Sequence, residues 1–164
     1  MPRKKRVLKR PSVAADKKFG SILVSKLTNR IMWDGKKTIS VRIVNEALTK
    51  ASDELKVAPV ELLEIVVSNV SPQVEVKSVR VGGANYQVPI EPYPARSLRL
   101  GLTWVVDGAR SIKGKPMAEK LATILIQSYK GEGPAVNKKE VMHKTAAGNK
   151  AFAHLASRAG KKKS

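Results

Sequence analysis

The amino-acid sequence predicts a mainly α-helical domain of six helices, with one protruding β-hairpin and basic terminal extensions. Three observations predict this fold class. Apolar residues recur at helical spacing over most of residues 19–156. Between about residues 73 and 91 the pattern changes to strand-like residues on both sides of a Gly-Gly pair. Lysine and arginine gather at both ends of the chain, and segments of that composition do not form an apolar core.

Three amphipathic helices are predicted in the first half of the chain. The first covers about residues 19–33 and the second about residues 38–55. The third begins at Pro59, because proline suits the first turn of a helix, and ends before Pro72. The side chains that we expect to face the core are Ile22, Leu23, Leu27 and Ile31 in the first helix, Ile39, Ile43, Val44, Ala47, Leu48, Ala51 and Leu55 in the second, and Leu62, Leu63, Val66, Val67 and Val70 in the third.

The segment at about residues 73–91 is predicted to form a β-hairpin. Gly82 and Gly83 supply the turn, because glycine adopts the positive φ angles that a tight hairpin requires. The tip then has one apolar and one polar face, and the polar face suits hydrogen bonding to base edges and phosphates, an ordinary solvated face being the alternative. The expected pairs are Val81–Ala84, Val79–Tyr86 and Lys77–Val88 on one face, and Arg80–Asn85 and Ser78–Gln87 on the other.

Three more helices are predicted after the hairpin, at about residues 95–111, 116–130 and 136–156. Their connections contain the breakers that such a division requires, notably Gly114 and the run from Gly131 to Pro134. The aromatic residues are few. We assign Trp33 and Trp104 to the core or its edge and Phe152 to packing, whereas Tyr86 either lies near a nucleic acid or packs against Val79.

The charge indicates the class of partner. Among 164 residues there are 32 Lys or Arg and 13 Asp or Glu, a formal net charge of +19. Residues 1–20 hold eight basic and one acidic residue, residues 132–164 hold eight and two, and residues 56–91 hold three and four. A polyanionic partner would relieve the repulsion between these charges. Basic segments that only keep the protein in solution are the alternative.

This distribution also predicts the domain organisation. We expect a basic N-terminal extension at residues 1–18, a single helical domain at residues 19–156 that includes the hairpin, and a basic C-terminal tail at residues 157–164. No uninterrupted apolar run exceeds three residues, so we expect a soluble protein without a membrane partner.

Catalytic and metal-binding patterns are missing from the sequence. The chain has no cysteine, which excludes a disulfide framework, a thiolate metal site and a cysteine nucleophile. Its two histidines, His143 and His154, would lie about three turns apart on one helix, too far apart to share a metal ion. The carboxylates mostly neighbour Lys or Arg at helical spacing, which is typical of solvated pairs. We therefore expect neither an enzyme nor a cofactor.

Four motifs, separated along the sequence, together resemble one known protein family. The sequence resembles bacterial small-subunit ribosomal protein seven over about residues 1–156, and four motifs on different elements make this resemblance specific. The motifs are Asn29-Arg30-Ile31-Met32 with Asp34-Gly35-Lys36-Lys37; the hairpin's Glu75-Val76-Lys77-Ser78, Arg80-Val81-Gly82-Gly83 and Tyr86-Gln87-Val88-Pro89; Trp104; and Asn149-Lys150 followed by Ala151-Phe152-Ala153-His154.

The resemblance implies a structural ribosomal protein. Members of that family bind the three-prime major domain of small-subunit ribosomal RNA and nucleate assembly of the subunit head. They lie near the exit-site tRNA and the mRNA path, and they contact small-subunit protein eleven. The implied location is the small ribosomal subunit in the cytoplasm, with an organellar ribosome left open.

Carried over by position, the resemblance also implies an RNA-binding surface. In this chain Val79, Tyr93, Ser97 and Thr103 stand where members usually have arginine, and Lys139 replaces a further arginine. The implied RNA-binding residues are Arg3, Lys4, Arg6, Lys9, Arg10, Lys36, Lys37, Lys77, Arg80, Gly82, Gly83, Tyr86, Arg96, Arg110, Lys113, Met117, Lys138, Lys139, His143, Lys144 and Lys150.

An architectural DNA-binding protein of the histone-like type is the alternative function, because a basic helical body with a β-arm also describes such proteins. Their arms usually insert proline or an apolar wedge at the tip. The tip here is Gly82-Gly83-Ala84-Asn85, which offers neither.

Overall fold

The fold is described from a computed structural model for residues 12–155. The predicted Arg3, Lys4, Arg6, Lys9 and Arg10, and the predicted tail at residues 157–164, lie outside the described residues. Within the described part, six α-helices, one two-stranded antiparallel hairpin and one short 3-10 helix confirm the predicted mainly α fold with a single hairpin. The elements are α1 (Ile22–Ile31), α2 (Lys37–Leu55), α3 (Pro59–Val70), β1 (Glu75–Val81), β2 (Ala84–Ile90), α4 (Pro94–Ser111), α5 (Met117–Tyr129), α6 (Pro134–Gly148) and η1 (Lys150–Leu155).

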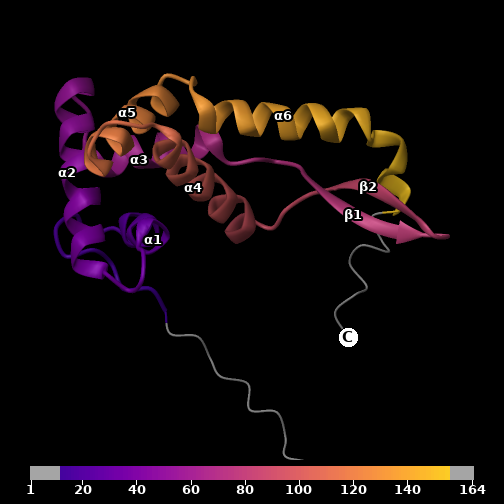
Figure 1. Ribbon diagram of the computed structural model, residues 1–164, viewed down its shortest axis with the longest axis horizontal. Helices are drawn as coiled ribbons and strands as arrows, with labels where there is room; N and C mark the ends of the chain where they lie inside the picture. The colour runs from indigo at the N-terminus through magenta and orange to yellow at the C-terminus, as the bar shows by residue number, and fades with distance from the viewer. Residues whose placement is uncertain (1–11, 156–164) are drawn as a thin grey trace, which may run out of the picture.

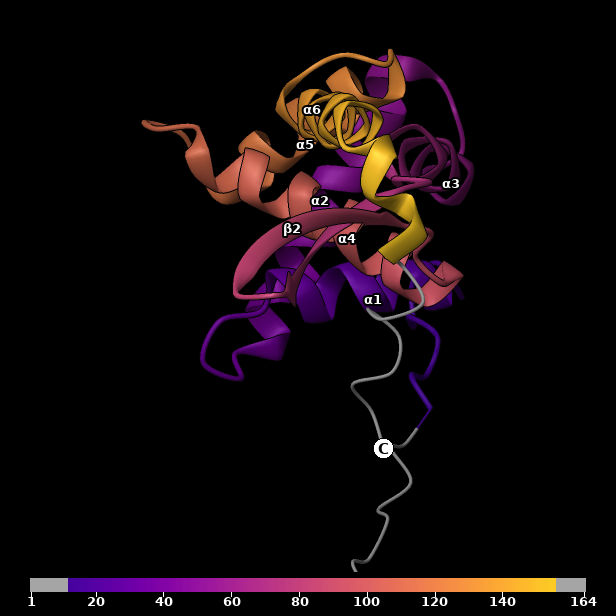
Figure 2. The ribbon, with the colours of Figure 1, turned by 90° about the vertical axis from the view of Figure 1, so that its right-hand side faces the viewer.

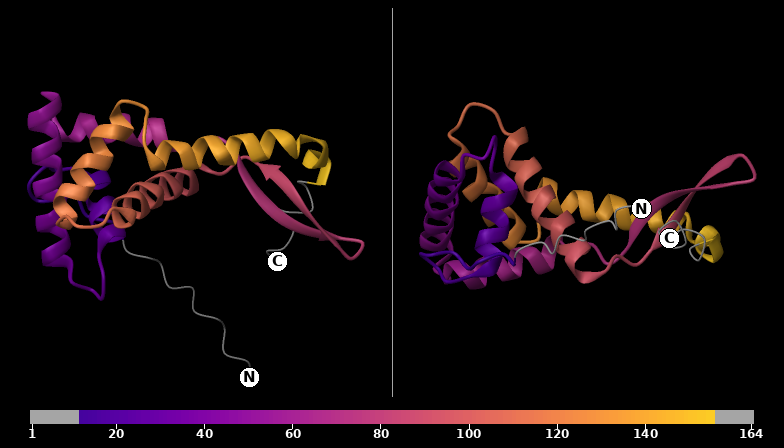
Figure 3. Two further views of the ribbon diagram at one scale, coloured as in Figure 1. Left: turned by 45° about the horizontal axis from the view of Figure 1, so that its top comes forward. Right: turned by 90° about the horizontal axis from the view of Figure 1, so that it is seen from below.

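The elements form two parts, which we call the helical body (α1 to α5) and the arm (β1, β2, α6 and η1). In Figure 1 the body lies on the left, and α6 and the hairpin extend from it to the right. Both views in Figure 3 show the hairpin leaving the body in the same general direction as α6. The hairpin therefore leans on helices at its base, and its tip projects beyond the body.

The first helix begins where a side chain caps it. The Ser21 hydroxyl accepts a hydrogen bond from the Leu23 N–H at 3.2 Å, which satisfies one of the unpaired donors of the first turn. Helix α1 therefore begins at Ile22, three residues later than predicted. It buries Leu27 and Ile31 as expected, and Val24 and Thr28 as well.

Two residues assigned to the core from the sequence are exposed. Ile22 has 51% of its surface exposed and Ile39 has 46%. Both lie in the first turn of their helices. The row of apolar residues on each helix begins there, before the part of the helix that packs against the core. The prediction that these two residues face the core is therefore wrong, whereas the other side chains predicted for helices α1 to α3 are buried or pack against the buried cluster.

The core lies between α1, α2, α3, α4 and α5, with the first turn of α6, and is built mainly from leucine, valine and alanine. Leu48, Leu63 and Leu121 are completely buried, and burying a side chain of this kind stabilises the fold by about 1.5–3 kcal/mol. Trp104 on α4 is only 8% exposed, which confirms its predicted place in the core. Gly101 allows α4 to approach the end of α3, because a Cβ there would lie 3.0 Å from the Ser71 Oγ.

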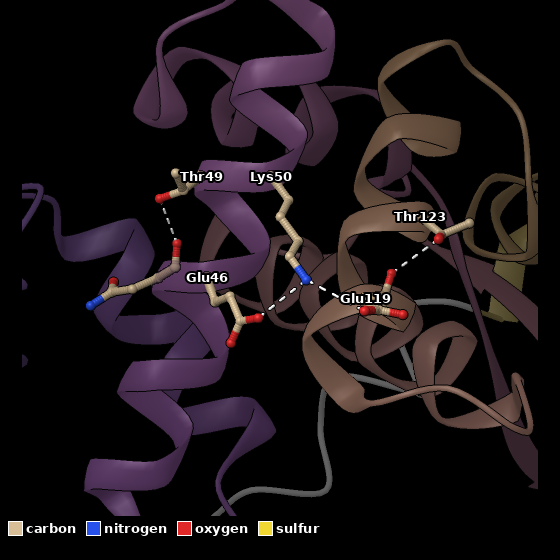
Figure 4. Close-up of polar contacts among 6 residues, drawn as sticks. Glu46, Thr49, Lys50, Glu119 and Thr123 are labelled. Atoms are coloured by element: carbon tan, nitrogen blue, oxygen red, sulfur yellow. Dashed lines mark hydrogen bonds and ion pairs between the residues drawn. The ribbon is translucent and has the colours of Figure 1, made fainter.

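A surface ion-pair group joins α2 to α5 (Figure 4). The Lys50 Nζ lies 3.2 Å from a Glu46 carboxylate oxygen and 3.5 Å from one of Glu119. The hydrogen bond to Glu46 is the largest cause of a raised pKa at Lys50. Desolvation opposes it, and the charges of Glu46 and Glu119 and a hydrogen bond to Glu119 add to the increase. These side chains are about half exposed, so solvent screens the pairs and they add little to stability.

The last predicted helix is divided in two. A single helix was expected at residues 136–156, but α6 ends at Gly148 and the chain continues as the 3-10 helix η1. The Asn149 backbone N–H and its side-chain amide both donate to the Thr145 carbonyl, at 3.1 and 2.9 Å, and cap the end of α6. The prediction that His143 and His154 share one helix is therefore wrong, because His154 lies on η1.

Candidate nucleic-acid interface

The hairpin has the predicted register. Its turn residues Gly82 and Gly83 have φ angles of 57° and 91°, which glycine adopts without steric cost. Every predicted pair is present, including Val79 opposite Tyr86 and Arg80 opposite Asn85. The polar face is exposed. On the other face Val79, Val81 and Tyr86 are half-buried and Val88 is fully buried, whereas Lys77 and Ala84 are exposed. The polar face consists of Ser78, Arg80, Asn85 and Gln87.

Arg96 anchors the base of the hairpin to α4. Its guanidinium makes a two-point contact with the Glu75 carboxylate, with 3.0 Å between Nε and Oε2 and a second, shorter bond from Nη2 to Oε1. Hydrogen bonding to Glu75 and the charge of Glu75 raise the pKa of Arg96 above its usual value. The Ser97 hydroxyl donates to the Pro72 carbonyl nearby, at 2.6 Å. Arg96, implied as an RNA-binding residue, thus has a structural contact on the protein itself.

The far end of the arm holds the hairpin through an aromatic contact. The rings of Tyr86 and Phe152 lie 5.2 Å apart between centroids and are tilted by 53°. Because Tyr86 is half-buried between Phe152 and its cross-strand partner Val79, its ring belongs to the packing of the arm. Phe152 packs as predicted, so η1 joins α6 to β2.

Several of the implied RNA-binding residues support the fold. The Lys139 Nζ donates to the Asn69 carbonyl in the last turn of α3 at 2.8 Å, where a cation is favoured. The Lys138 Nζ lies 3.7 Å from an Asp107 carboxylate oxygen. The His143 Nε2 accepts a hydrogen bond from the Gln73 N–H at 3.1 Å, and Met117 packs against the core. The contacts of Lys138, Lys139 and His143 hold α6 against the body and the base of the hairpin, whereas Met117 lies at the start of α5.

The remaining implied cations face outward. Within residues 12–155, the side chains of Lys36, Lys37, Arg80, Lys113, Lys144 and Lys150 form no ion pair. Lys77 is also exposed, on β1, and Gly82 and Gly83 are exposed at the hairpin tip. The outward-facing residues are Lys36, Lys37, Arg80, Lys113, Lys144 and Lys150. The structure thus divides the implied residues between the arm and the edge of the body where α1 and α4 end.

At that edge the structure corrects the assignment of Trp33. Its side chain is 65% exposed, so it does not belong to the core. The Arg110 guanidinium carbon lies 5.1 Å from the centroid of the Trp33 ring, and Nη2 of Arg110 donates to the Ile31 carbonyl at 3.3 Å. Figure 2 shows the α1–α2 turn and the α4–α5 connection, which carries Lys113, projecting on the same side of the body. Sequence reasoning missed this cluster, although Trp33 stands next to the Asp34-Gly35 helix stop and hence outside the helical stripe.

Three further cations were missed because two helices distant in the sequence bring them together. Lys26, Arg30 and Arg99 line a cavity of about 650 Å³ between α1 and α4, with Val13 and Leu98 also in its wall. From the sequence alone these are ordinary polar positions of two separate helices.

Within residues 12–155, no group of three or more His, Asp or Glu side chains has an arrangement that could hold a metal ion. None of the helices in that range is both long and apolar enough to cross a lipid bilayer.

Comparison with known proteins identifies the family. A family model described as ribosomal protein S7p/S5e matches residues 2–150. Small ribosomal subunit protein uS7 of Thermosipho africanus is 49% identical over 143 residues, covering 87% of this chain and 92% of its own length. The proteins of the same name from Thermotoga maritima and Moorella thermoacetica are each 48% identical, covering 93% and 94% of this chain and 97% and 98% of their own lengths. The chain therefore belongs to the ribosomal protein S7p/S5e family and is a structural, non-enzymatic protein of the small ribosomal subunit.

Proposed function

We propose that this protein binds the three-prime major domain of small-subunit ribosomal RNA and nucleates assembly of the subunit head. The observation that carries the proposal is the set of outward-facing cations on two separate parts of a protein that belongs to this family. Cations on the arm and on the edge of the body would contact phosphates at separate places on a folded RNA. Recognition by shape, rather than by base sequence, follows from such spacing.

The proposed contacts differ in kind. We propose residues 19–156 as the RNA-binding domain and the segments before and after it as basic extensions. In this domain the polar face of the hairpin would reach bases and phosphates, whereas the lysines would act as point charges on phosphate. Arg96, Lys138, Lys139, His143, Met117 and Tyr86 would first position the RNA-binding surface, since each has a contact within the protein.

The position of the hairpin tip suits contacts with RNAs other than the ribosomal RNA. Because the tip projects from the body and exposes Arg80 and Asn85, we propose that it lies near the exit-site tRNA and the mRNA path. Small-subunit protein eleven is the proposed protein neighbour. The bacterial relatives support a cytoplasmic ribosome as the location.

None of the four positions where the family usually has arginine carries a cation in this chain, and three of them have contacts within the protein. Val79 faces Tyr86 on the apolar side of the hairpin, and the Ser97 and Thr103 hydroxyls donate to the carbonyls of Pro72 and Arg99. Tyr93 precedes α4 and is 68% exposed. We therefore leave all four out of the proposed surface.

Footprinting on small-subunit ribosomal RNA tests the proposal directly. The purified protein should protect a compact set of nucleotides within the three-prime major domain and leave the other domains unchanged. A competition experiment distinguishes RNA binding from the alternative, architectural DNA binding. Duplex DNA of matched length, at about 150 mM salt, should displace little of the bound RNA. Protection outside the three-prime domain, or efficient displacement by DNA, would contradict the proposal.

A further inference from the structure

We propose that Trp33 and Arg110 form a stacking site for one unpaired nucleobase, an inference that rests on the proposed RNA-binding function. The ligand class is a single-stranded nucleotide whose base carries an exocyclic amino group. Neither the family match nor the motifs in the sequence point to Trp33 as a contact.

The backbone holds Trp33 in a fixed position. The Trp33 carbonyl accepts a hydrogen bond from the Lys36 N–H at 2.9 Å, which closes a four-residue turn directly after α1. The two central residues, Asp34 and Gly35, have φ angles of 50° and 74°, as a type I′ turn requires. A tight turn of this kind presents the indole ring outward without the freedom of a long loop.

Arg110 covers one face of the ring. Its guanidinium carbon lies 5.1 Å from the ring centroid, and its bond to the Ile31 carbonyl fixes the guanidinium between α1 and α4. Trp33 is nevertheless 65% exposed. Because Arg110 covers one face of its ring, the exposed surface comes from the opposite face and the ring edges. A base stacked on that opposite face would complete a sandwich of base, indole and guanidinium, and base–aromatic stacking is the usual way in which proteins hold unpaired bases.

The surroundings of the ring indicate which base fits. Trp33 lines a cavity of about 400 Å³ whose wall also contains Arg30, Asp34, Asp107 and Arg110. Ionised carboxylates only accept hydrogen bonds, so Asp34 and Asp107 would favour bases with an amino group, such as cytosine or adenine, over uracil. Asp107 has one oxygen, Oδ2, 3.7 Å from the Lys138 Nζ. Its other oxygen remains available to accept a hydrogen bond from a base.

The charge around the ring favours an RNA ligand over a protein neighbour. Lys36 and Lys37 follow Trp33 in the same turn, and both side chains are exposed. Arg110 lies on the ring itself. These cations would receive the phosphates that flank a stacked base, whereas an apolar protein contact would have to desolvate them.

Fluorescence of Trp33 provides the first test. The chain has two tryptophans, and Trp104 is buried, so the variant Trp104→Phe leaves Trp33 as the only tryptophan reporter. The probes are poly(A), poly(C), poly(U) and inorganic polyphosphate at equal total charge. Poly(A) and poly(C) should quench the emission with saturation, poly(U) should quench it less, and polyphosphate should leave it unchanged. Equal effects of all four probes, or no quenching by any of them, would overturn the proposal.

Affinity provides the second test and does not depend on Trp104. Trp33→Leu should weaken binding of a three-prime major domain transcript by roughly 5- to 150-fold, because stacking is worth about 1–3 kcal/mol per base and 1.4 kcal/mol is tenfold. Trp33→Tyr, which keeps an aromatic ring, should restore most of the affinity. The control Ile22→Ala removes an exposed apolar side chain at the other end of α1 and should leave affinity unchanged.

The two tests distinguish failure of this proposal from failure of the proposed function. If the wild-type protein binds the transcript and Trp33→Leu binds equally well, the stacking site is refuted, Trp33 is left for a protein neighbour, and the proposed function stands. If the wild-type protein does not bind the transcript at all, the proposed function itself is refuted.

Discussion

At the scale of single residues, the cations of this protein divide into those that hold the fold and those that face outward. Arg96, Lys139 and Arg110 each bind a carboxylate or a helix-end carbonyl. Arg80 and Lys144 are exposed and form no ion pair within residues 12–155. Substitution in the first group should change stability, and in the second group only RNA affinity.

Arg96→Ala tests the first group. Removing the guanidinium leaves the Glu75 carboxylate, whose side chain is only 16% exposed, without its partner. We expect hydrogen exchange at the hairpin amides to become faster, by an amount equivalent to about 1 kcal/mol of local stability. This value is smaller than for a fully buried ion pair, because the Arg96 side chain is 38% exposed and solvent screens the contact. Arg96→Lys should recover only part of this, since lysine lacks the planar fork. Unchanged hairpin exchange in Arg96→Ala would show that the pair does not anchor the hairpin.

Arg80→Ala tests the second group. Arg80 faces Asn85 on the exposed side of the hairpin, so its loss removes no packing. We expect thermal unfolding to be the same as in the wild type, while affinity for ribosomal RNA falls by roughly the value of one charge-assisted contact, about 1–2 kcal/mol. Calorimetry and filter binding measure the two effects. A lower melting temperature would mean that Arg80 has a structural role.

At the scale of elements, the arm depends on a contact between its two ends. Phe152 on η1 packs on Tyr86 of β2, far from the base where Arg96 holds Glu75. The contact can form only because α6 stops at Gly148 and the chain turns back. The hairpin is thus held at two points, which a two-stranded ribbon requires because it is only marginally stable alone.

Phe152→Ala should release η1 from the hairpin without unfolding the body. An aromatic pair contributes about 0.5–1.5 kcal/mol beyond its buried area. We expect faster hydrogen exchange in β2 and η1 and unchanged exchange in α2 and α5. Phe152→Tyr keeps the ring and is the matched control. Equal loss of protection in the arm and the body would show that the arm is part of the same cooperative unit.

The close approach of α3 and α4 has its own test. In Gly101→Ala the new Cβ would lie 3.0 Å from the Ser71 Oγ and 3.4 Å from the Ser71 backbone nitrogen, so Ser71 at the end of α3 must shift to make room. Overpacking of about 1–3 kcal/mol outweighs a gain of about 1 kcal/mol in helix propensity, and we expect a net loss of about 1 kcal/mol in urea unfolding. Gly148→Ala, which meets nothing within 4 Å, is the control and should be neutral or stabilising. Equal effects of the two substitutions would contradict the close packing.

The elements were largely predictable from the sequence, and their long-range contacts were not. The period of the apolar residues predicted six helices, and Gly82-Gly83 predicted the hairpin with its register. Errors arose at helix ends: Ile39 continues the stripe of α2 but lies beyond the core, and α6 was extended through a stop at Gly148 and Asn149. The Glu75–Arg96 and Lys139–Asn69 contacts join residues 21 and 70 positions apart, and no local pattern encodes such distances.

At the scale of the whole molecule, charge is separated from the core. The buried residues are apolar apart from Thr28, Ser40 and Ser128 among those described, and none of the lysines or arginines of residues 12–155 is buried. The fold is therefore stable through burial, while a polyanion reduces the repulsion of the net charge of +19.

Deletion of residues 2–10 tests the contribution of the N-terminal segment. It removes six lysines and arginines that precede the first predicted helix. We expect a lower RNA affinity and a flatter dependence of that affinity on salt, with unfolding of the remaining chain unchanged. Replacement of the same six residues by serine keeps the length and should reproduce the effect. An unchanged salt slope would remove the N-terminal segment from the RNA-binding surface.

The salt dependence of affinity for a three-prime major domain transcript tests the central claim most directly. Release of counterions from about 6–10 phosphate contacts predicts that affinity falls by roughly 10³–10⁵ between 50 and 200 mM salt, in a linear plot of the logarithms. An affinity that hardly changes over this range, or the absence of binding at the low-salt end, would contradict the account that outward-facing cations bind this protein to ribosomal RNA.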